Sequence, residues 1–113
     1  MRRGEVYWYV FKSLDKRRPV LILTRSSVIP YLNTVTIAPI TSRIREIPSE
    51  VLLTIEDGMP SVCAANFDHI QTVDKSKIGE FITRLSFERL DEVREAVYFA
   101  LGLDNENWVM VDT

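Results

Sequence analysis

The sequence predicts a mainly β fold, in which a small, strongly bent antiparallel sheet or half-open β-barrel carries one C-terminal helix. Short runs of β-branched and aromatic residues recur over the first 85 residues, and Gly and Pro turn signals separate them. Only one segment has apolar residues at helical spacing. At 113 residues we expect a single domain over 1–113, with a barrel over about 3–85, a helix over about 87–101 and a tail over 104–113.

The first half of the chain contains three predicted strands. Residues 6–11 form a continuous aromatic and β-branched run, typical of a buried strand. The polar residues 12–18 predict a loop, and a second strand begins at Pro19 and continues to residue 24, because proline is tolerated at the first position of a strand. Residues 34–40 alternate, with Val35 and Ile37 on one face and Thr34 and Thr36 on the other, which predicts the third strand.

The next segment contains further strands between polar loops. Residues 41–46 are polar and predict a loop, and a strand follows through 51–55. The turn signal Asp57-Gly58-Met59-Pro60 ends it. Another strand is expected from 61 to about 73, with a bend near Asp68, and a last one over about 78–85.

The helix near the end has clear boundary signals. Ser86 is a favourable N-cap, Glu88 lies in the first turn, where the helix dipole stabilises an anion, and Gly102 can end the helix. Apolar residues recur every three or four positions and should cover the core: Phe87, Leu90, Val93, Val97 and Leu101. We therefore interpret the helix as structural. The tail contains Trp108-Val-Met-Val111, which could pack back or pair as an edge strand.

Charge is unevenly distributed along the chain. Residues 1–46 hold nine Lys and Arg against three acids, and the remainder holds five against thirteen, although the net charge is −2. This polarity could give a dimer a basic groove, and chance segregation on solvated surfaces is the alternative.

Cysteine and histidine content narrows the class of protein. With only Cys63 and His69, neither an internal disulfide framework nor a zinc site is expected, and we predict no metal or cofactor. Cys63 should be a small buried hydrophobe. We expect a cytoplasmic protein without a membrane segment, since the start lacks the apolar core of a signal peptide and no apolar run reaches about 20 residues.

Three segments, read in order, resemble the MazF/PemK toxins of type II toxin–antitoxin systems. Arg3-Gly-Glu-Val-Tyr-Trp8 is similar to that family's opening strand, and Arg18-Pro-Val-Leu-Ile-Leu-Thr24 to its Arg-Pro-aliphatic second strand. Ala38-Pro-Ile-Thr-Ser42 and Asn66-Phe-Asp-His-Ile-Gln-Thr-Val-Asp74 resemble its Val-Pro-x-Thr-Ser and Asp-Gln-x-x-Thr-hydrophobic-Asp segments. Each fragment alone is weakly specific, but together they span about residues 3–85.

The resemblance implies a fold of the MazF/CcdB toxin type and a homodimer. It also implies a metal-independent, sequence-selective endoribonuclease that cuts single-stranded RNA to a 2′,3′-cyclic phosphate and a 5′-hydroxyl and so inhibits translation and growth. Its partner would be a cognate antitoxin. We expect a disordered segment with acidic and apolar residues, laid across the basic groove.

The resemblance places catalytic roles on three residues. Arg18 would stabilise the charge of the phosphorane, since a guanidinium can hold two phosphate oxygens. Thr41 would hydrogen-bond the phosphate or orient the 2′-hydroxyl, although a threonine at a strand end often satisfies its own backbone. Asp68 matches the aspartate that some relatives use as general base, and capping a loop or reading a base are its alternatives. Surface exposure in a basic loop is the alternative for Arg18.

Further residues are candidates for RNA binding, most of them in the same predicted loops: Lys16, Arg17, Ser42, Arg43, Arg45, Asn66, His69 and Gln71. His69 stands where the family commonly has Gln, and it could act as an acid or base or stack on a base. Strict alternation, however, would put it on the face opposite Asp68. Asn66 stands where some relatives have an arginine, and the loop 12–18 is shorter than is usual. Tyr7, Trp8, Tyr9 and Phe11 could stack on bases, but at strand spacing they are more often core.

Two other functions remain open on the sequence alone. The first is a CcdB-like toxin, which would bind DNA gyrase through its C-terminal residues. The apolar tail is compatible with this function, whereas Arg18-Pro and Thr41 argue against it. A barrel that binds RNA without cutting it is the second alternative.

Overall fold

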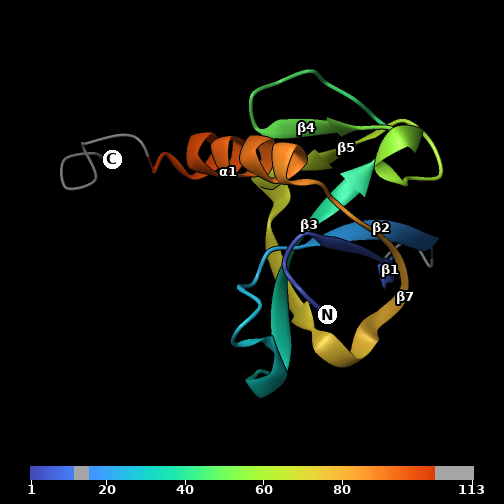
Figure 1. Cartoon of the computed structure of the whole chain (residues 1–113), viewed down its shortest axis with the longest axis vertical. Helices are drawn as coiled ribbons and strands as arrows, with labels where there is room; N and C mark the ends of the chain where they lie inside the picture. Colours follow the sequence, from blue (N-terminus) through green and yellow to red (C-terminus); the bar gives the residue numbers. More distant parts are fainter. Residues whose placement is uncertain (12–15, 104–113) are drawn as a thin grey trace.

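Seven strands form one bent antiparallel sheet in the computed structural model, which describes residues 1–11 and 16–103 (Figure 1). The order of the strands is β4-β5-β3-β2-β1-β7, and β6 pairs with β3. Over the described residues the sheet does not close on itself, so the predicted half-open barrel with a C-terminal helix is confirmed. None of the described helices is long and apolar enough to cross a membrane. The elements are β1 (Glu5–Phe11), β2 (Lys16–Ile22), β3 (Thr34–Thr41), β4 (Glu50–Leu53), β5 (Cys63–Asn66), β6 (Gln71–Asp74), β7 (Ile78–Arg84) and α1 (Phe87–Leu101).

The predicted loop 12–18 is partly a strand. Lys16, Arg17 and Arg18 belong to β2, and each pairs with a residue of β1. The prediction was wrong here because a run of cationic side chains carries no apolar signal, whereas pairing with β1 extends the strand. Residues 12–15 and the tail 104–113 lie outside the described residues, so the expectations for them stay predictions.

Strand β3 takes part in two halves of the sheet. Its first part pairs with β2 and β6, and its last residues, Ile40 and Thr41, pair with Ala65 and Ala64 of β5. Pairing with β2 ends at Val20 opposite Pro39, and proline has no N–H to donate to a ladder. Beyond this point β3 turns toward β5 and its end diverges from β2.

Two predicted strands are interrupted by 3-10 turns. β4 ends at Leu53, and Ile55 lies in η2 (Ile55–Asp57), because the Thr54 side chain and Asp57 form a capping box. The strand predicted over 61–73 is β5 and β6, separated by η3 (Phe67–His69). The bend expected near Asp68 is therefore a complete turn.

Two apolar clusters fill the space on either side of the bend. The cluster beneath α1 includes Val6, Leu21, Leu53, Phe67 and Val93, while a second cluster is built from β2, β3 and β6 around Val20, Ile22 and Ile37. Alternate residues of β2 thus enter different clusters, as the two-residue period of a strand requires.

Helix α1 begins and ends as predicted. The Ser86 hydroxyl accepts a hydrogen bond from the Arg89 N–H, and Gly102 ends the helix with a φ of 65°. The predicted apolar stripe is buried only in its middle, at Val93. Phe87 is 86% exposed and Leu101 is 51% exposed, so the prediction that both cover the core was wrong. The periodicity gave the correct face, but the core does not extend to the helix ends.

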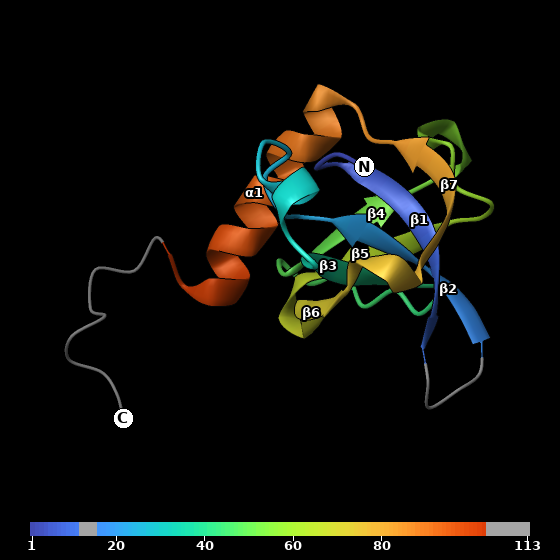
Figure 2. The same cartoon turned by 90° about the horizontal axis from the view of Figure 1, so that it is seen from below.

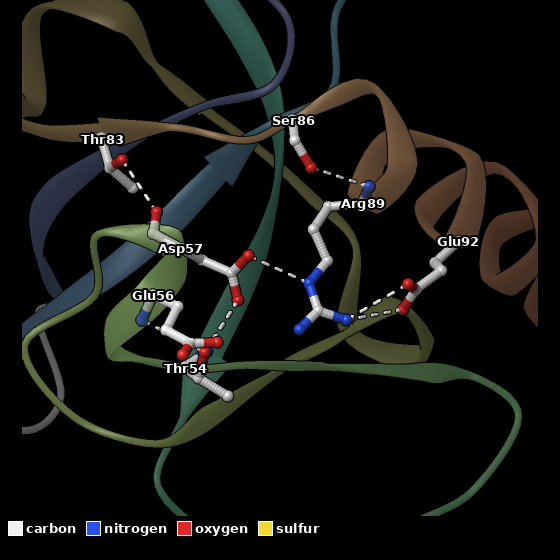
Figure 3. A network of polar contacts seen from close by, with 7 residues as sticks. All are labelled: Thr54, Glu56, Asp57, Thr83, Ser86, Arg89 and Glu92. Atoms are coloured by element: carbon white, nitrogen blue, oxygen red, sulfur yellow. Dashed lines mark hydrogen bonds and ion pairs between the residues drawn. The ribbon is translucent and has the colours of Figure 1, made fainter.

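A polar network joins α1 to η2 and β7 (Figure 3). Arg89 Nε donates to Asp57 Oδ1 over 3.0 Å, and the Thr54 N–H donates to Asp57 Oδ2 over 2.8 Å. The Thr83 hydroxyl donates to the Asp57 carbonyl oxygen over 2.9 Å. The network fixes the start of residues 58–62, several of which line the groove described below.

Replacing Asp57 by asparagine should destabilise the fold in a pH-dependent way. Burial alone would raise the pKa of the Asp57 carboxyl, but hydrogen bonds from Arg89 and Thr54 together outweigh burial and lower its pKa. A lowered pKa contributes stability above the unfolded-state value, and this stability is lost as pH falls through the folded-state pKa. We expect Asp57→Asn to lower the free energy of unfolding at neutral pH by about 1–3 kcal/mol.

Urea unfolding at a series of pH values measures this effect, with the exposed Asp91→Asn as the matched control. The difference between wild type and Asp57→Asn should shrink below about pH 4. A difference that stays constant into strong acid would contradict the electrostatic explanation.

Candidate functional site

A groove lies where β2 and β3 diverge, lined by residues from both strands. Strand β1 lies beside β2 on its other edge (Figure 2). If the β2–β3 register continued past Val20 and Pro39, Arg18 would lie opposite Thr41. Because β3 turns to β5 instead, the space between these two positions stays open. It holds a larger hollow of about 280 Å³ and a smaller one of about 180 Å³, and both Arg18 and Thr41 line each of them.

Arg18 has an unusual environment. The residue is half-buried, and its Nε is buried without a hydrogen-bond partner in the part of the chain that the structure describes. A buried donor without a partner costs free energy, and native proteins rarely keep one. An anion in the groove would supply the missing acceptor, and a phosphate matches the planar fork of a guanidinium.

Thr41 lies on the opposite side of the groove, at the end of β3. Its Oγ1 accepts a hydrogen bond from the Arg43 N–H over 3.1 Å. This bond fixes the oxygen at the end of β3, while the hydroxyl hydrogen can still be donated to a ligand. Thr41 therefore makes the local backbone contact that a strand-end threonine often makes, and it also lines both hollows.

Most of the predicted RNA-binding residues surround this junction. Lys16, Arg17 and Ser42 line the larger hollow, and Arg43, Arg45, Asn66 and His69 line the smaller one. Five of the nine cations of residues 1–46 thus gather at one groove. Among the described residues, no Asp or Glu lines either hollow, so the groove suits an anionic ligand.

The predicted residues of the η3 region divide into two groups. Asn66, only 3% exposed, lines the smaller hollow, and its Oδ1 accepts from the Asp68 N–H over 2.9 Å. Asp68 and Gln71 are exposed and line neither hollow. Strand alternation does not decide where His69 points, because His69 and Asp68 lie in a 3-10 turn.

Sequence reasoning missed the residue that orients Asp68. The Ser49 hydroxyl donates to Asp68 Oδ2 over 2.6 Å, and Ser49 is buried. Ser49 follows Pro48 in a polar segment and belongs to no motif, so no local signal could have identified it. Within the described part of the chain, Asp68 Oδ1 has no hydrogen-bond donor, so this oxygen can accept a hydrogen bond from a ligand.

Cys63 also borders the larger hollow, but its environment makes it inert. Burial, with a smaller contribution from the Asp57 charge, raises the pKa of the Cys63 thiol to about 11. At neutral pH the side chain is therefore a protonated thiol and a poor nucleophile. The prediction that Cys63 is a small buried residue is confirmed, since it is 6% exposed.

Comparison with known proteins gives consistent matches over the described part of the chain. A family model described as a PemK-like, MazF-like toxin of type II toxin–antitoxin systems matches residues 2–101. A probable endoribonuclease MazF2 from Mycobacterium tuberculosis is 38% identical over 103 residues, which cover 90% of this chain and 99% of that protein. Endoribonuclease MazF from Staphylococcus saprophyticus is 31% identical over 111 residues, covering 91% and 92%.

Solved structures agree with the sequence relatives. The M. tuberculosis toxin MazF-mt6 superposes with a TM-score of 0.79 at 34% identity, covering 87% of this chain and 96% of that chain. A MazE–MazF structure from Deinococcus radiodurans has a TM-score of 0.73 at 28% identity, covering 90% and 95%.

Proposed function

The chain belongs to the PemK/MazF family of type II toxin–antitoxin toxins, and on this basis we propose that it is an endoribonuclease that cuts single-stranded RNA without a metal. The products are a 2′,3′-cyclic phosphate and a 5′-hydroxyl, and cutting cytoplasmic RNA inhibits translation and growth. The observation that carries the proposal is the groove at Arg18 and Thr41, which is cationic and contains a buried guanidinium donor without a partner among the described residues. The names of the relatives, which include several endoribonucleases, support it.

The reaction needs a proton acceptor, charge stabilisation and a proton donor. The 2′-oxygen of the substrate attacks the adjacent phosphorus and gives its proton to the acceptor. The bond from phosphorus to the 5′-oxygen breaks, and that oxygen takes a proton from a water molecule, which is the donor in this scheme. Arg18 binds the equatorial phosphate oxygens, whose negative charge increases in the transition state. The Thr41 hydroxyl donates to the same phosphate and fixes its position beside Arg18.

Asp68 is the proposed proton acceptor. Ser49 holds Oδ2 and leaves Oδ1 for the 2′-hydroxyl of a strand that lies across η3. Replacing Asp68 by asparagine keeps the shape but removes the basic oxygen, so kcat should fall about 100-fold or more while KM changes little. Initial rates on a cleavable RNA measure both constants.

The neighbouring His69→Gln variant is the control for Asp68→Asn. His69 lines the smaller hollow and is the second candidate for the acceptor. A large loss of kcat in His69→Gln, with Asp68→Asn close to wild type, would transfer the role to His69.

The direct test of the proposed function is incubation of the purified protein with a long single-stranded RNA in EDTA, followed by mapping of the ends. Cutting at a short recurring motif with cyclic-phosphate ends is the expected result. Intact RNA from a protein that still arrests growth would favour the gyrase-binding alternative. Binding without cutting would identify the RNA-binding barrel.

A cognate antitoxin is the proposed protein partner. The five cations of the groove would attract an acidic segment, and apolar residues in it would add burial. An endoribonuclease of the same fold from a mycobacterial species has been solved in complex with its cognate antitoxin, and MazF from D. radiodurans has been solved with MazE. Both structures support this partner. RNA and the antitoxin segment should therefore compete, and unchanged RNA cutting in excess antitoxin would contradict a shared groove.

The exposed apolar face of α1 is the proposed homodimer interface. A largely apolar hollow of about 860 Å³ lies between α1 and the sheet, lined by Leu23, Ile70, Phe87, Leu90 and Leu101 among others. Apolar faces of this kind commonly mark protein interfaces. Phe87→Ser should convert the dimer to a monomer in sedimentation equilibrium, whereas Ile55→Ser, at another exposed apolar position, should not. If both variants sediment with the same molecular mass, this face is not the dimer interface.

A further inference from the structure

Three neighbouring strands bring Trp8, Arg17 and Glu80 together, and the first two of these residues line the larger hollow. Trp8 lies on β1, Arg17 on β2 and Glu80 on β7. The Arg17 guanidinium carbon lies 4.5 Å from the centroid of the Trp8 ring, and Arg17 Nη1 lies 3.5 Å from Glu80 Oε1. Arg17 thus covers the ring of a half-buried aromatic residue and is held there by an acid from the third strand.

A β-bulge places Glu80 in this position. Tyr7 pairs with Phe81 and Tyr9 pairs with Ile78, so Gly79 and Glu80 both stand opposite Trp8. Bulges of this kind bend a strand, redirect a side chain and are enriched beside active sites. At the bulge β7 approaches β1 closely: a Cβ atom at Gly79 would be only 3.0 Å from the Trp8 carbonyl oxygen. A larger residue at 79 would push the two strands apart.

We propose that Trp8 is the stacking platform for a nucleobase next to the cut phosphate, and that Arg17, held by Glu80, is a removable cap on this platform. The inference rests on the proposed function for the identity of the strand as RNA. Trp8, Arg17, Arg18 and Thr41 line the same hollow. A base on Trp8 therefore belongs to a nucleotide adjoining the phosphate at Arg18. Stacking on an aromatic ring tolerates every base, because each has a π face.

The cap can be displaced at little cost. The side chains of Arg17 and Glu80 are 56% and 83% exposed, and exposed ion pairs contribute little to stability. The contact between Arg17 and the ring is also weak at such a site. An incoming phosphate replaces Glu80 as the partner of Arg17, while the base replaces the guanidinium on the ring. Glu80 consequently competes with the substrate for Arg17 and lowers the affinity of the groove for polyanions.

Uncleavable strands separate stacking from charge. Single-stranded DNA lacks the 2′-hydroxyl, and an abasic strand of equal length carries the same phosphates without bases. The wild type should bind the base-containing strand at least about 10-fold tighter than the abasic strand. Trp8→Leu should lose this preference for the base-containing strand while binding the abasic strand as tightly as the wild type does. Trp8→Phe should keep most of the preference. Glu80→Gln should bind both strands tighter than the control Glu95→Gln, an exposed acid on α1 that makes the same change of charge.

Fluorescence gives a readout that leaves Trp8 in place. Trp8 and Trp108 are the two tryptophans, so Trp108→Phe makes Trp8 the only tryptophan, which is excited selectively at wavelengths that tyrosine does not absorb. Its emission should be quenched by the base-containing strand more than by the abasic strand. Equal affinity of the wild type for both strands, or an unchanged ratio in Trp8→Leu, would overturn the inference. If the wild type cuts RNA but binds the base-containing and abasic strands equally, only the role of Trp8 in stacking is refuted. If it prefers the base-containing strand but does not cut RNA, only the proposed endoribonuclease function is refuted.

Discussion

Replacing Arg18 by alanine is expected to lower kcat/KM for RNA cutting about 100- to 1,000-fold. The guanidinium lines both hollows and is the proposed partner of the phosphorane oxygens, whose charge is greatest in the transition state. Arg18→Lys keeps the charge but not the fork that holds two oxygens, so it should recover only part of the loss. Initial rates on an RNA with one mapped cut site measure these values.

The same substitution separates catalysis from stability. Arg18 Nε is buried without a partner among the described residues, so its loss should leave the free energy of unfolding unchanged or increase it. Arg25→Ala, which removes an exposed arginine outside both hollows, is the matched control and should cut RNA at the wild-type rate. If Arg18→Ala cuts RNA within a few-fold of Arg25→Ala, Arg18 does not stabilise the transition state.

Replacing Phe67 by alanine should lower the free energy of unfolding by about 3–5 kcal/mol. Phe67 is 1% exposed and packs in the cluster beneath α1, and its N–H donates to the Ser49 carbonyl oxygen over 2.9 Å. Its ring thus anchors η3, the turn that carries Asp68 and His69. Urea unfolding monitored by circular dichroism measures the loss.

Phe99→Ala is the control for this prediction, because Phe99 is 55% exposed on α1. It should cost no more than about 0.5 kcal/mol. A similar small loss in Phe67→Ala would mean that η3 does not depend on the buried ring. The position of Asp68 would then need another explanation.

Local signals in the sequence predicted much of the fold. The apolar run at 6–11 and the alternation at 34–40 gave β1 and β3, because side chains of those types fit a pleated, half-buried surface. Ser86 and Gly102 gave the ends of α1, since their capping chemistry is local. Lys16 and Arg17 were assigned to a loop, because their strand conformation comes from pairing with β1 and not from their own propensity.

The geometry of the site could not be predicted in the same way. The resemblance supplied Arg18 and Thr41, but their proximity depends on the register of Val20 with Pro39 and on the turn of β3 toward β5. The contacts of Ser49 with Asp68 and of Arg17 with Glu80 join distant parts of the chain. Pairs of this kind leave no periodic pattern, so only the folded chain reveals them.

The most direct test of the account uses an RNA in which the single nucleotide before a mapped cut carries a 2′-deoxy sugar. If the substrate's own 2′-hydroxyl is the nucleophile, this RNA should remain intact at that position in EDTA. The unmodified RNA should be cut there and end in a cyclic phosphate. Cutting at the 2′-deoxy position would contradict the account, because water or a protein group would then be the nucleophile.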